Sequence, residues 1–246
     1  MAPSKDYPET DHVFDGGSMD CGSGLILLIR QNMLQVPSAG VLEIRSSEPT
    51  VESELPPWCR MVGHEHLQSV QVEPGSWRHW VRRGTDDKAE QEELDSDKKK
   101  AQEFKWSLRA RRTTQIETTV YSRNFSWQSG SSIDFDRAGV LPSSLEQFFG
   151  ALVADVINCF AVRCSRRNIL LDELEGTLNG TLSDSLAAVG IEQGDSSVKE
   201  IKLVVYATSP ADSAEVKQEW DLASYDSPVF QTLKKSCEID SRLVLI

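Results

Sequence analysis

In the first third of the chain, segments whose hydrophobic residues have the spacing of a strand alternate with segments that have the spacing of a helix. The segment 41–47 alternates at every second residue as a strand does, whereas 24–35 is apolar on most sides, as a buried helix is. The predicted elements, in chain order, are a strand before the Gly16-Gly17 turn, a helix over 24–35, a strand over 41–47, a helix over 51–62, and strands over 67–73 and 77–82. This order predicts a small two-layer α/β sandwich (βαβαββ).

The last part of the chain combines strands with one long apolar segment. The elements predicted there are a β meander over 115–127 and 132–135, a helix over 145–167, strands over 173–182 and 200–209, helices over 210–222 and 227–236, and a strand over 242–246. The helix over 145–167 is the longest, and it is apolar along much of its length, so we expect it to be buried. The fold class is therefore α+β, with the second domain built around a buried central helix.

A charged segment separates these two regions. The stretch 86–100 contains seven acidic residues and four lysines with almost nothing apolar, so burial cannot offset the entropy cost of ordering it. We interpret it as either a linker or a solvated helix. The predicted organisation is a first domain over 12–83, a charged linker over 84–112 and a second domain over 113–246.

Charge and cysteine content narrow the function classes. The formal net charge of −12 argues against a protein that wraps duplex nucleic acid, whose affinity comes from neutralising phosphates. The basic cluster of Lys105, Arg109, Arg111 and Arg112 is too small to reverse this, although contact with a tRNA or an acidic partner stays open. No apolar run approaches the roughly 18 residues of a membrane span, and the start has no secretory signal pattern.

The cysteines are odd in number, which together with the missing signal pattern predicts reduced thiols in a cytoplasmic protein. They are Cys21, Cys59, Cys159, Cys164 and Cys237. None has the C-x-x-C spacing of a structural zinc site, so we expect no metal and no cofactor.

Cys21 is the strongest candidate for chemistry. It lies between small residues that include Gly22 and Gly24, just before the helix predicted over 24–35. The free N–H groups and the dipole at a helix start favour a thiolate, which predicts a lowered pKa and a reactive sulfur. The alternative is an ordinary cysteine in a loop.

Residues 12–83 resemble the TusA/SirA family of sulfur carriers. The resemblance is carried by Asp15, Cys21, Glu48-Pro49, Trp58-Cys59 and Gly63-His64-Glu65. It implies that Cys21 carries a persulfide and hands its sulfane sulfur to a partner protein, with Asp15 fixing the loop rather than acting as a base. The family motif Cys-Pro-x-Pro has Gly22 and Gly24 in place of its prolines here, which predicts a looser turn.

Three other residues of this region have plain interpretations. Cys59, beside Trp58, is expected in the core. His64 and His66 form an H-x-H pattern, which is weak as a metal site without a third ligand.

The second domain resembles the OsmC/Ohr family of thiol peroxidases. The resemblance rests on the helical segment 145–176 and on SPVFQTL at 227–233. The two family cysteines fall on Asp155 and Ser227, whereas a family glutamate matches Glu146. Without a thiolate at either position, peroxidase activity is not expected. The family's intertwined dimers imply a homodimer, with Glu146 and Asp155 as residues of a ligand-binding remnant.

Asp155 needs a partner, because a carboxylate in an apolar helix must be paired or face a pocket. Arg163 and Arg123 are the candidates that the sequence offers. Cys159 follows Asp155 by one helical turn, so it is either a core residue or a displaced reactive thiol.

Three functions follow from these features. The leading one is a sulfurtransferase-like carrier that relays sulfur on Cys21 between donor and acceptor proteins. The others are a thiol-dependent hydroperoxide reductase that uses Cys159, and a non-catalytic scaffold of a redox or sulfur pathway.

Overall fold

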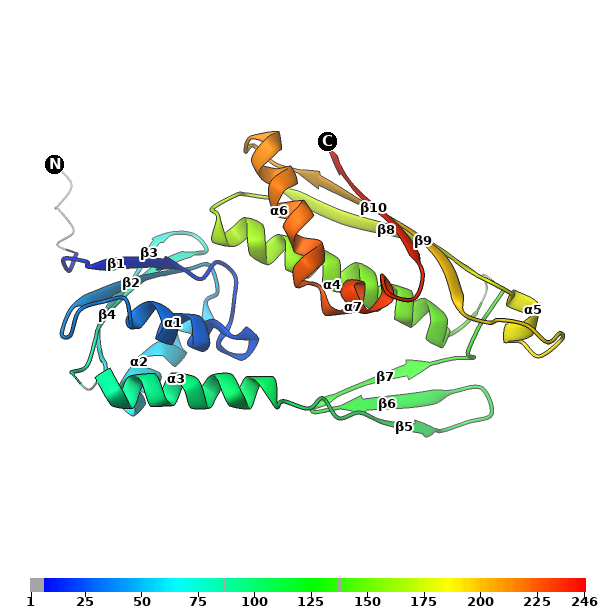
Figure 1. Ribbon diagram of the computed structural model, residues 1–246, viewed down its shortest axis with the longest axis horizontal. Helices are drawn as coiled ribbons and strands as arrows, with labels where there is room; N and C mark the ends of the chain where they lie inside the picture. The colour runs from blue at the N-terminus through cyan, green and yellow to red at the C-terminus, as the bar shows by residue number, and fades with distance from the viewer. Residues whose placement is uncertain (1–6, 86, 137–138) are drawn as a thin grey trace. The chain divides into compact units, whose positions relative to one another are not determined.

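The computed structural model describes residues 7–85, 87–136 and 139–246. Their elements form two compact units, and the chain passes from the first to the second between Phe104 and Lys105. These are the N-terminal unit and the C-terminal unit (Figure 1).

The N-terminal unit contains a four-stranded sheet. Its strands, in spatial order, are β1 (His12–Asp15), β2 (Val41–Ser46), β4 (Ser76–Arg82) and β3 (Glu65–Glu73). β1 is parallel to β2, and the other two pairs are antiparallel. The helical elements are the 3-10 turn η1 (Cys21–Ser23), α1 (Leu25–Met33) and α2 (Thr50–Val62). The predicted order of strands and helices is confirmed, with η1 as an addition.

The core of this unit lies between the sheet and the two helices. Leu42 and Ile44 of β2 are fully buried against Ile29 of α1 and Leu55 of α2. Because side chains alternate along a strand, the intervening Glu43 points to the opposite face, where its carboxylate accepts a hydrogen bond from Arg45 Nε at 2.8 Å. The alternation in β2 thus sets which face of the sheet the helices cover.

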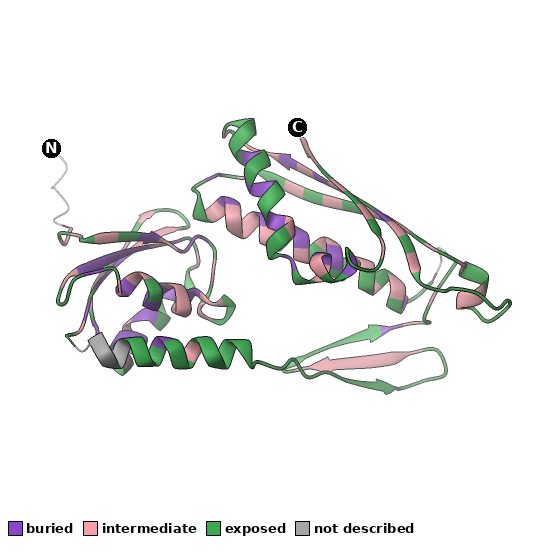
Figure 2. Cartoon of the chain, in the orientation of Figure 1, coloured by how far each residue is buried: buried purple, intermediate pink, exposed green. Residues whose placement is uncertain are grey.

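The segment predicted as a linker or a solvated helix contains α3 (Asp87–Gln102). This helix belongs to the N-terminal unit, and it packs against α1. Most of its described side chains are exposed (Figure 2), whereas Leu94 has an accessible fraction of 1%. A single apolar residue is therefore enough to show which side of α3 faces the unit.

Charge fixes α3 in place. The guanidinium of Arg30 on α1 is almost fully buried, and it pairs with Glu93 at 2.6 Å and Asp97 at 3.1 Å, both on α3. The same group lies 5.5 Å from the ring centroid of Trp58 on α2. A buried cation thus connects all three helices.

The C-terminal unit has two three-stranded sheets and four helices among the described residues. Their bounds are β5 (Arg109–Arg112), β6 (Thr118–Ser122), β7 (Phe125–Ser129), α4 (Ser144–Arg166), β8 (Glu173–Leu182), α5 (Ser185–Ala188), β9 (Val198–Thr208), α6 (Ser213–Asp226), α7 (Pro228–Leu233) and β10 (Glu238–Leu245). β5, β6 and β7 form an antiparallel meander, whereas β9 pairs in parallel with β10 and antiparallel with β8.

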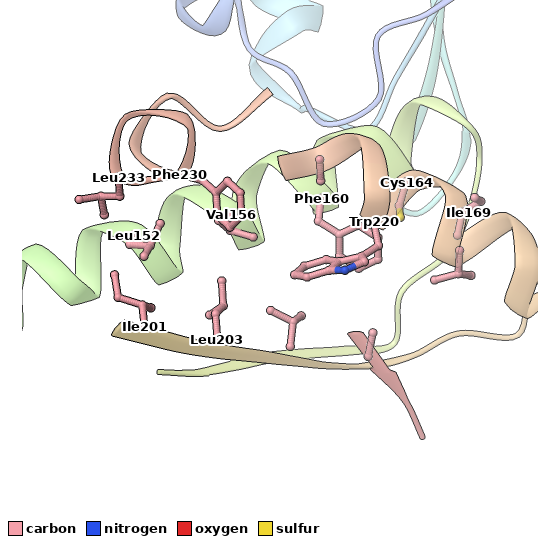
Figure 3. Packing of buried hydrophobic residues seen from close by; sticks show 14 residues of the cluster. Leu152, Val156, Phe160, Cys164, Ile169, Ile201, Leu203, Trp220, Phe230 and Leu233 are labelled. Carbon is pink, nitrogen blue, oxygen red and sulfur yellow. The ribbon is translucent and has the colours of Figure 1, made fainter. Parts of the chain in front are cut away.

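The long helix α4 is the centre of this unit, as predicted. Its buried residues are Leu152, Val156, Phe160 and Cys164. Their spacing of four places them in one stripe, which packs on Leu203 of β9 and on side chains of α6 and α7 (Figure 3). The ring of Phe160 meets that of Trp220 edge-on, with centroids 5.5 Å apart.

Two strand predictions were wrong. The segment 132–135 is a loop, because the Asp134 side chain accepts from the backbone N–H of Asp136 and the Ser131 hydroxyl donates to the Ile133 carbonyl. The strand β5 was missed, since it lies in the region predicted as linker and its sequence RARR contains nothing strongly apolar.

Among the described residues, α4 is the one helix long and apolar enough to cross a membrane, with a mean hydropathy of 1.5 over its most apolar window. This is weak evidence for a span, because core helices of globular proteins share the property.

Candidate functional site

Cys21 is the first residue of η1 rather than of α1. Asp20 caps this turn: its Oδ1 accepts from Ser23 N at 2.6 Å, and Ser23 Oγ accepts from Asp20 N at 3.0 Å. Gly24, with φ of 104°, then separates η1 from α1. Cys21 thus lies just before α1, as expected, but the turn η1 and the left-handed residue Gly24 separate the thiol from the first residue of that helix.

The surroundings of the thiol also differ from expectation. Burial, a hydrogen bond to the Glu54 carboxylate, and the negative charges of Glu54 and Asp20 raise the pKa of Cys21 to about 12. The prediction of a lowered pKa was wrong, because desolvation and two carboxylates disfavour the thiolate and the helix start is displaced from the sulfur. Sequence reasoning missed Glu54, since no spacing rule connects α2 to η1.

Asp15 holds the turn that follows β1. Its Oδ1 accepts a hydrogen bond from the backbone N–H of Gly17 at 2.9 Å, and Gly17 has the left-handed φ of 57°. This geometry agrees with the expectation that Asp15 fixes the loop.

The two glycines beside Cys21 are not equivalent. A side chain at Gly24 is strained by its left-handed φ, whereas a Cβ at Gly22 meets only Asp20 Oδ1, at 3.4 Å. The second proline of the family motif therefore does not fit this backbone, because proline fixes φ near −65°.

The substitution Gly24→Pro is expected to destabilise the N-terminal unit by about 2 kcal/mol, since proline cannot take the native φ. Hydrogen–deuterium exchange of the α1 segment in the full chain measures this loss. Gly22→Pro is the matched control, with an expected cost of less than about 1 kcal/mol. Equal losses of protection in the two variants would contradict the assignment of strain to Gly24.

In the C-terminal unit, the residues at the two positions of the family cysteines, Asp155 and Ser227, are hydrogen-bonded to each other. The hydroxyl of Ser227 donates to Asp155 Oδ2 at 2.5 Å, and the backbone N–H of Val229 donates to the same oxygen at 3.0 Å. Ser227 is fully buried as the N-cap of α7, where its Oγ accepts from Phe230 N at 3.1 Å. A carboxylate and an alcohol thus join α4 to α7.

The predicted arginine partners of Asp155 are engaged elsewhere. Arg163 pairs with Glu219 at 2.9 Å and with Asp226 at 2.5 Å. The Arg123 guanidinium lies 5.4 Å from the ring centroid of Phe125. The pairing expected from the sequence was wrong, because the hydroxyl and the amide at the start of α7 satisfy Asp155.

Cys159 is half-buried against the core of this unit. Burial and the charges of Asp155 and Asp226 raise the pKa of its thiol to about 11, although Arg163 acts in the opposite direction. At neutral pH this thiol is protonated, which is unfavourable for attack on a peroxide.

Glu146 serves as a helix cap. Its Oε2 accepts from the backbone N–H and the hydroxyl of Ser143, both at 2.7 Å, and these bonds lower the pKa of the carboxyl. The Ser143 hydroxyl accepts from Glu146 N in return, which completes a capping box at the start of α4.

Two histidines of the first domain, His66 and His79, form a polar cluster that the sequence did not predict. The hydroxyl of Ser69 lies 2.8 Å from His66 Nε2 and 2.7 Å from His79 Nδ1. His79 is fully buried, and burial lowers its pKa to about 4, with a smaller contribution from His66. Cys59 is fully buried, which confirms its place in the core. In the described part of the chain, no three His, Cys, Asp or Glu side chains gather as a metal site.

No family model matches the chain. Over 76 residues it is 26% identical to the sulfur carrier protein TusA of Pseudomonas putida strain GB-1, a match that covers 31% of this chain and 92% of that protein. The TusA of Pseudomonas syringae pv. syringae is 28% identical over 61 residues, which are 25% of this chain and 71% of that protein.

The comparison with solved structures concerns the C-terminal part of the chain. The OsmC-like protein of Mycoplasma pneumoniae superposes with a TM-score of 0.51 at 18% identity, covering 58% of this chain and 99% of that one. At this identity the similarity concerns the fold. The chain thus joins a TusA-like N-terminal part to a C-terminal part with the OsmC-like fold.

Proposed function

We propose that this protein is a sulfur carrier in which Cys21 holds sulfane sulfur as a persulfide. The observation that carries the proposal is the similarity to TusA over 92% of that protein's length. The thiol is half-buried on the first residue of a short turn, so part of its surface stays accessible to a reaction partner.

The transfer balances without an external oxidant or reductant. The Cys21 sulfur attacks the terminal sulfur of an ionised donor persulfide, R–S–S⁻, so that a new S–S bond forms and the donor S–S bond breaks. The donor leaves as R–SH with the proton that Cys21 loses, and the negative charge moves to the terminal sulfur on Cys21. Delivery to an acceptor thiol is the same exchange in reverse.

The partners in this proposal are a donor protein and an acceptor protein in the cytoplasm. Because the raised pKa keeps the Cys21 thiol protonated at neutral pH, loading by a small persulfide is expected to be slow, and the incubation described below is continued until the mass no longer changes. All five cysteines, each within the described residues, are free thiols, which suits a reducing compartment.

The OsmC-like unit is proposed to form a homodimer. The antiparallel meander of β5, β6 and β7 is mostly exposed (Figure 2). Phe125 and Trp127, two residues apart on β7, lie on one face of it, with 63% and 40% of their surfaces accessible. Exposed aromatic side chains on a sheet favour association with a second copy. Analytical ultracentrifugation of the full chain tests this, and a monomer at all concentrations would contradict it.

The test of the proposed function is the intact mass of the full chain after incubation with glutathione persulfide. We expect the mass of one added sulfur atom, removable by a thiol reductant, and complete loss of the adduct in Cys21→Ser. Cys237→Ser is the control, since this half-buried thiol lies in the other unit and its variant is expected to load normally. An adduct of equal yield in Cys21→Ser would contradict the proposal.

A further inference from the structure

Positive charge is concentrated in the segment that forms the meander of β5, β6 and β7. Residues 105–129 contain five cations and one carboxylate, although the whole chain has a formal net charge of −12. The cations, all of them exposed, are Lys105, Arg109, Arg111, Arg112 and Arg123. The carboxylate, Glu117, accepts a hydrogen bond from Gln128 Nε2 at 2.5 Å. A basic segment in an acidic chain indicates a contact with an anionic partner.

The pairing of the strands places two of these arginines on one face of the meander. Because side chains alternate along a strand, Arg109 and Arg111 of β5 point to the same side. The strand register extends this side across β6 and β7 through Tyr121, Thr119, Ser126 and Gln128. These six residues are named the basic face.

The opposite face of the meander is turned towards α4. Its Trp127 Nε1 donates to Gln147 Oε1 of α4 at 3.0 Å, and its Ser129 hydroxyl lies 2.9 Å from that of Ser144. The basic face therefore points away from α4. It is also separate from the face of Phe125 and Trp127 that is proposed for the homodimer.

A cation and an aromatic ring are stacked at the centre of the basic face. The guanidinium carbon of Arg109 lies 4.5 Å from the ring centroid of Tyr121, its partner in the register. Since Arg109 is exposed, the side of the guanidinium away from the ring is open to a ligand. Nucleobases stack on guanidinium planes and aromatic rings, whereas a carboxylate has no planar ring to stack.

The neighbours of this pair suit the other two parts of a nucleotide. Arg111, two residues along β5, offers the forked donors that bind a phosphate. The hydroxyls of Thr119 and Ser126 can exchange hydrogen bonds with a ribose 2′-OH, the group that distinguishes RNA from DNA. Stacking, phosphate and ribose contacts are thus available within one exposed sheet face.

We infer that the basic face binds single-stranded RNA, with a base stacked on Arg109 over Tyr121 and a backbone phosphate on Arg111. A duplex hides its bases from such a site, which agrees with the net charge that argues against a duplex-wrapping protein. This role goes beyond the sulfur chemistry of Cys21 and does not depend on it.

The test is fluorescence anisotropy of a labelled single-stranded RNA of about 12 nucleotides, titrated with the full chain. Contacts with about two phosphates predict a slope of about −1.4 for the logarithm of the association constant against that of the salt concentration. The Kd is therefore expected to rise about sevenfold between about 50 and 200 mM salt. DNA of the same sequence and the RNA duplex are both expected to bind more weakly.

Two variants with the same chemical change separate stacking from charge. Arg109→Lys keeps the charge but removes the planar group over Tyr121, so we expect a Kd about three- to tenfold higher with an unchanged salt slope. Arg111→Lys is the matched control, for which we expect a change in Kd of less than about twofold.

A second pair of variants tests the phosphate contact. Arg111→Gln is expected to reduce the steepness of the salt dependence by about 0.7, the contribution of one phosphate. Lys202→Gln removes an exposed cation from β9, on the other sheet of the same unit, and is expected to leave both the Kd and the slope unchanged.

Several outcomes would overturn the inference. The first is the absence of measurable RNA binding at low salt. Binding of a polyglutamate peptide as tight as that of RNA would instead assign the basic face to an acidic protein partner. Equal affinities for RNA and DNA, or equal losses in Arg109→Lys and Arg111→Lys, would contradict the ribose contact and the stacking, respectively.

Discussion

Replacing Glu93 by Gln and Asp97 by Asn together is expected to destabilise the docking of α3 by about 3 kcal/mol. The reason is Arg30, which is only 5% exposed and would keep its charge without either carboxylate. Removing the partners of a buried charge costs about 3–5 kcal/mol, and we take the lower end because Glu93 is half exposed. The packing of Arg30 over Trp58 does not replace the lost ion pairs.

Hydrogen–deuterium exchange of the α1 and α3 segments in the full chain measures this effect. The control variant, Glu92→Gln with Asp95→Asn, also removes two negative charges from α3, but from exposed side chains. We expect early exchange of α3 in the first variant and nearly unchanged protection in the control. Equal protection in both would mean that Leu94 alone holds the helix.

Acidification from pH 6.5 to pH 4 is expected to lower the free energy of unfolding of the N-terminal unit by about 3 kcal/mol through His79 alone. The size follows because a tenfold difference in proton affinity between the folded and unfolded states is worth about 1.4 kcal/mol. The pKa of His79 is lowered from 6.5 to about 4, so the folded state binds fewer protons than the unfolded state. The stabilisation is complete above the unfolded pKa and is lost as the pH falls through the folded pKa. The lowered pKa of His66 acts in the same direction.

Exchange protection of β3 and β4, compared at neutral pH and near pH 4, measures this dependence. His79→Gln is expected to flatten it, because the variant has nothing to protonate there. His12→Gln is the control: this half-buried imidazole bonds Asn32 at the sheet edge, and its loss is expected to leave the acid dependence of β3 and β4 in place. An unchanged slope in His79→Gln would contradict the assignment.

The elements that sequence periodicity predicted well are those whose apolar residues face one core. In β2 the alternation of Leu42 and Ile44 with Glu43 is explicit in the sequence, and α4 repeats an apolar residue at every fourth position. By contrast, β5 owes its existence to pairing with β6, such as Arg109 opposite Tyr121. Pairing between strands requires no repeating pattern of apolar residues, so the residues of β5 alone do not indicate a strand.

The contacts at the candidate sites likewise differ in how well the sequence predicted them. The family pattern placed Asp155 and Ser227 at matching positions, and the structure brings these residues, 72 positions apart, into a hydrogen bond. The Glu54 carboxylate beside Cys21 had no such signal, because it arises from the way α2 packs. Local sequence therefore predicted which sulfur to examine, whereas its charge environment depends on tertiary structure.

The bond between Asp155 and Ser227 has a consequence for how the C-terminal unit responds to its surroundings. Two thiols at these positions would exchange electrons with the glutathione pool, and the link between α4 and α7 would open and close with its redox potential. A carboxylate and an alcohol exchange protons but not electrons. This link between α7 and α4 therefore does not depend on the redox potential of its surroundings.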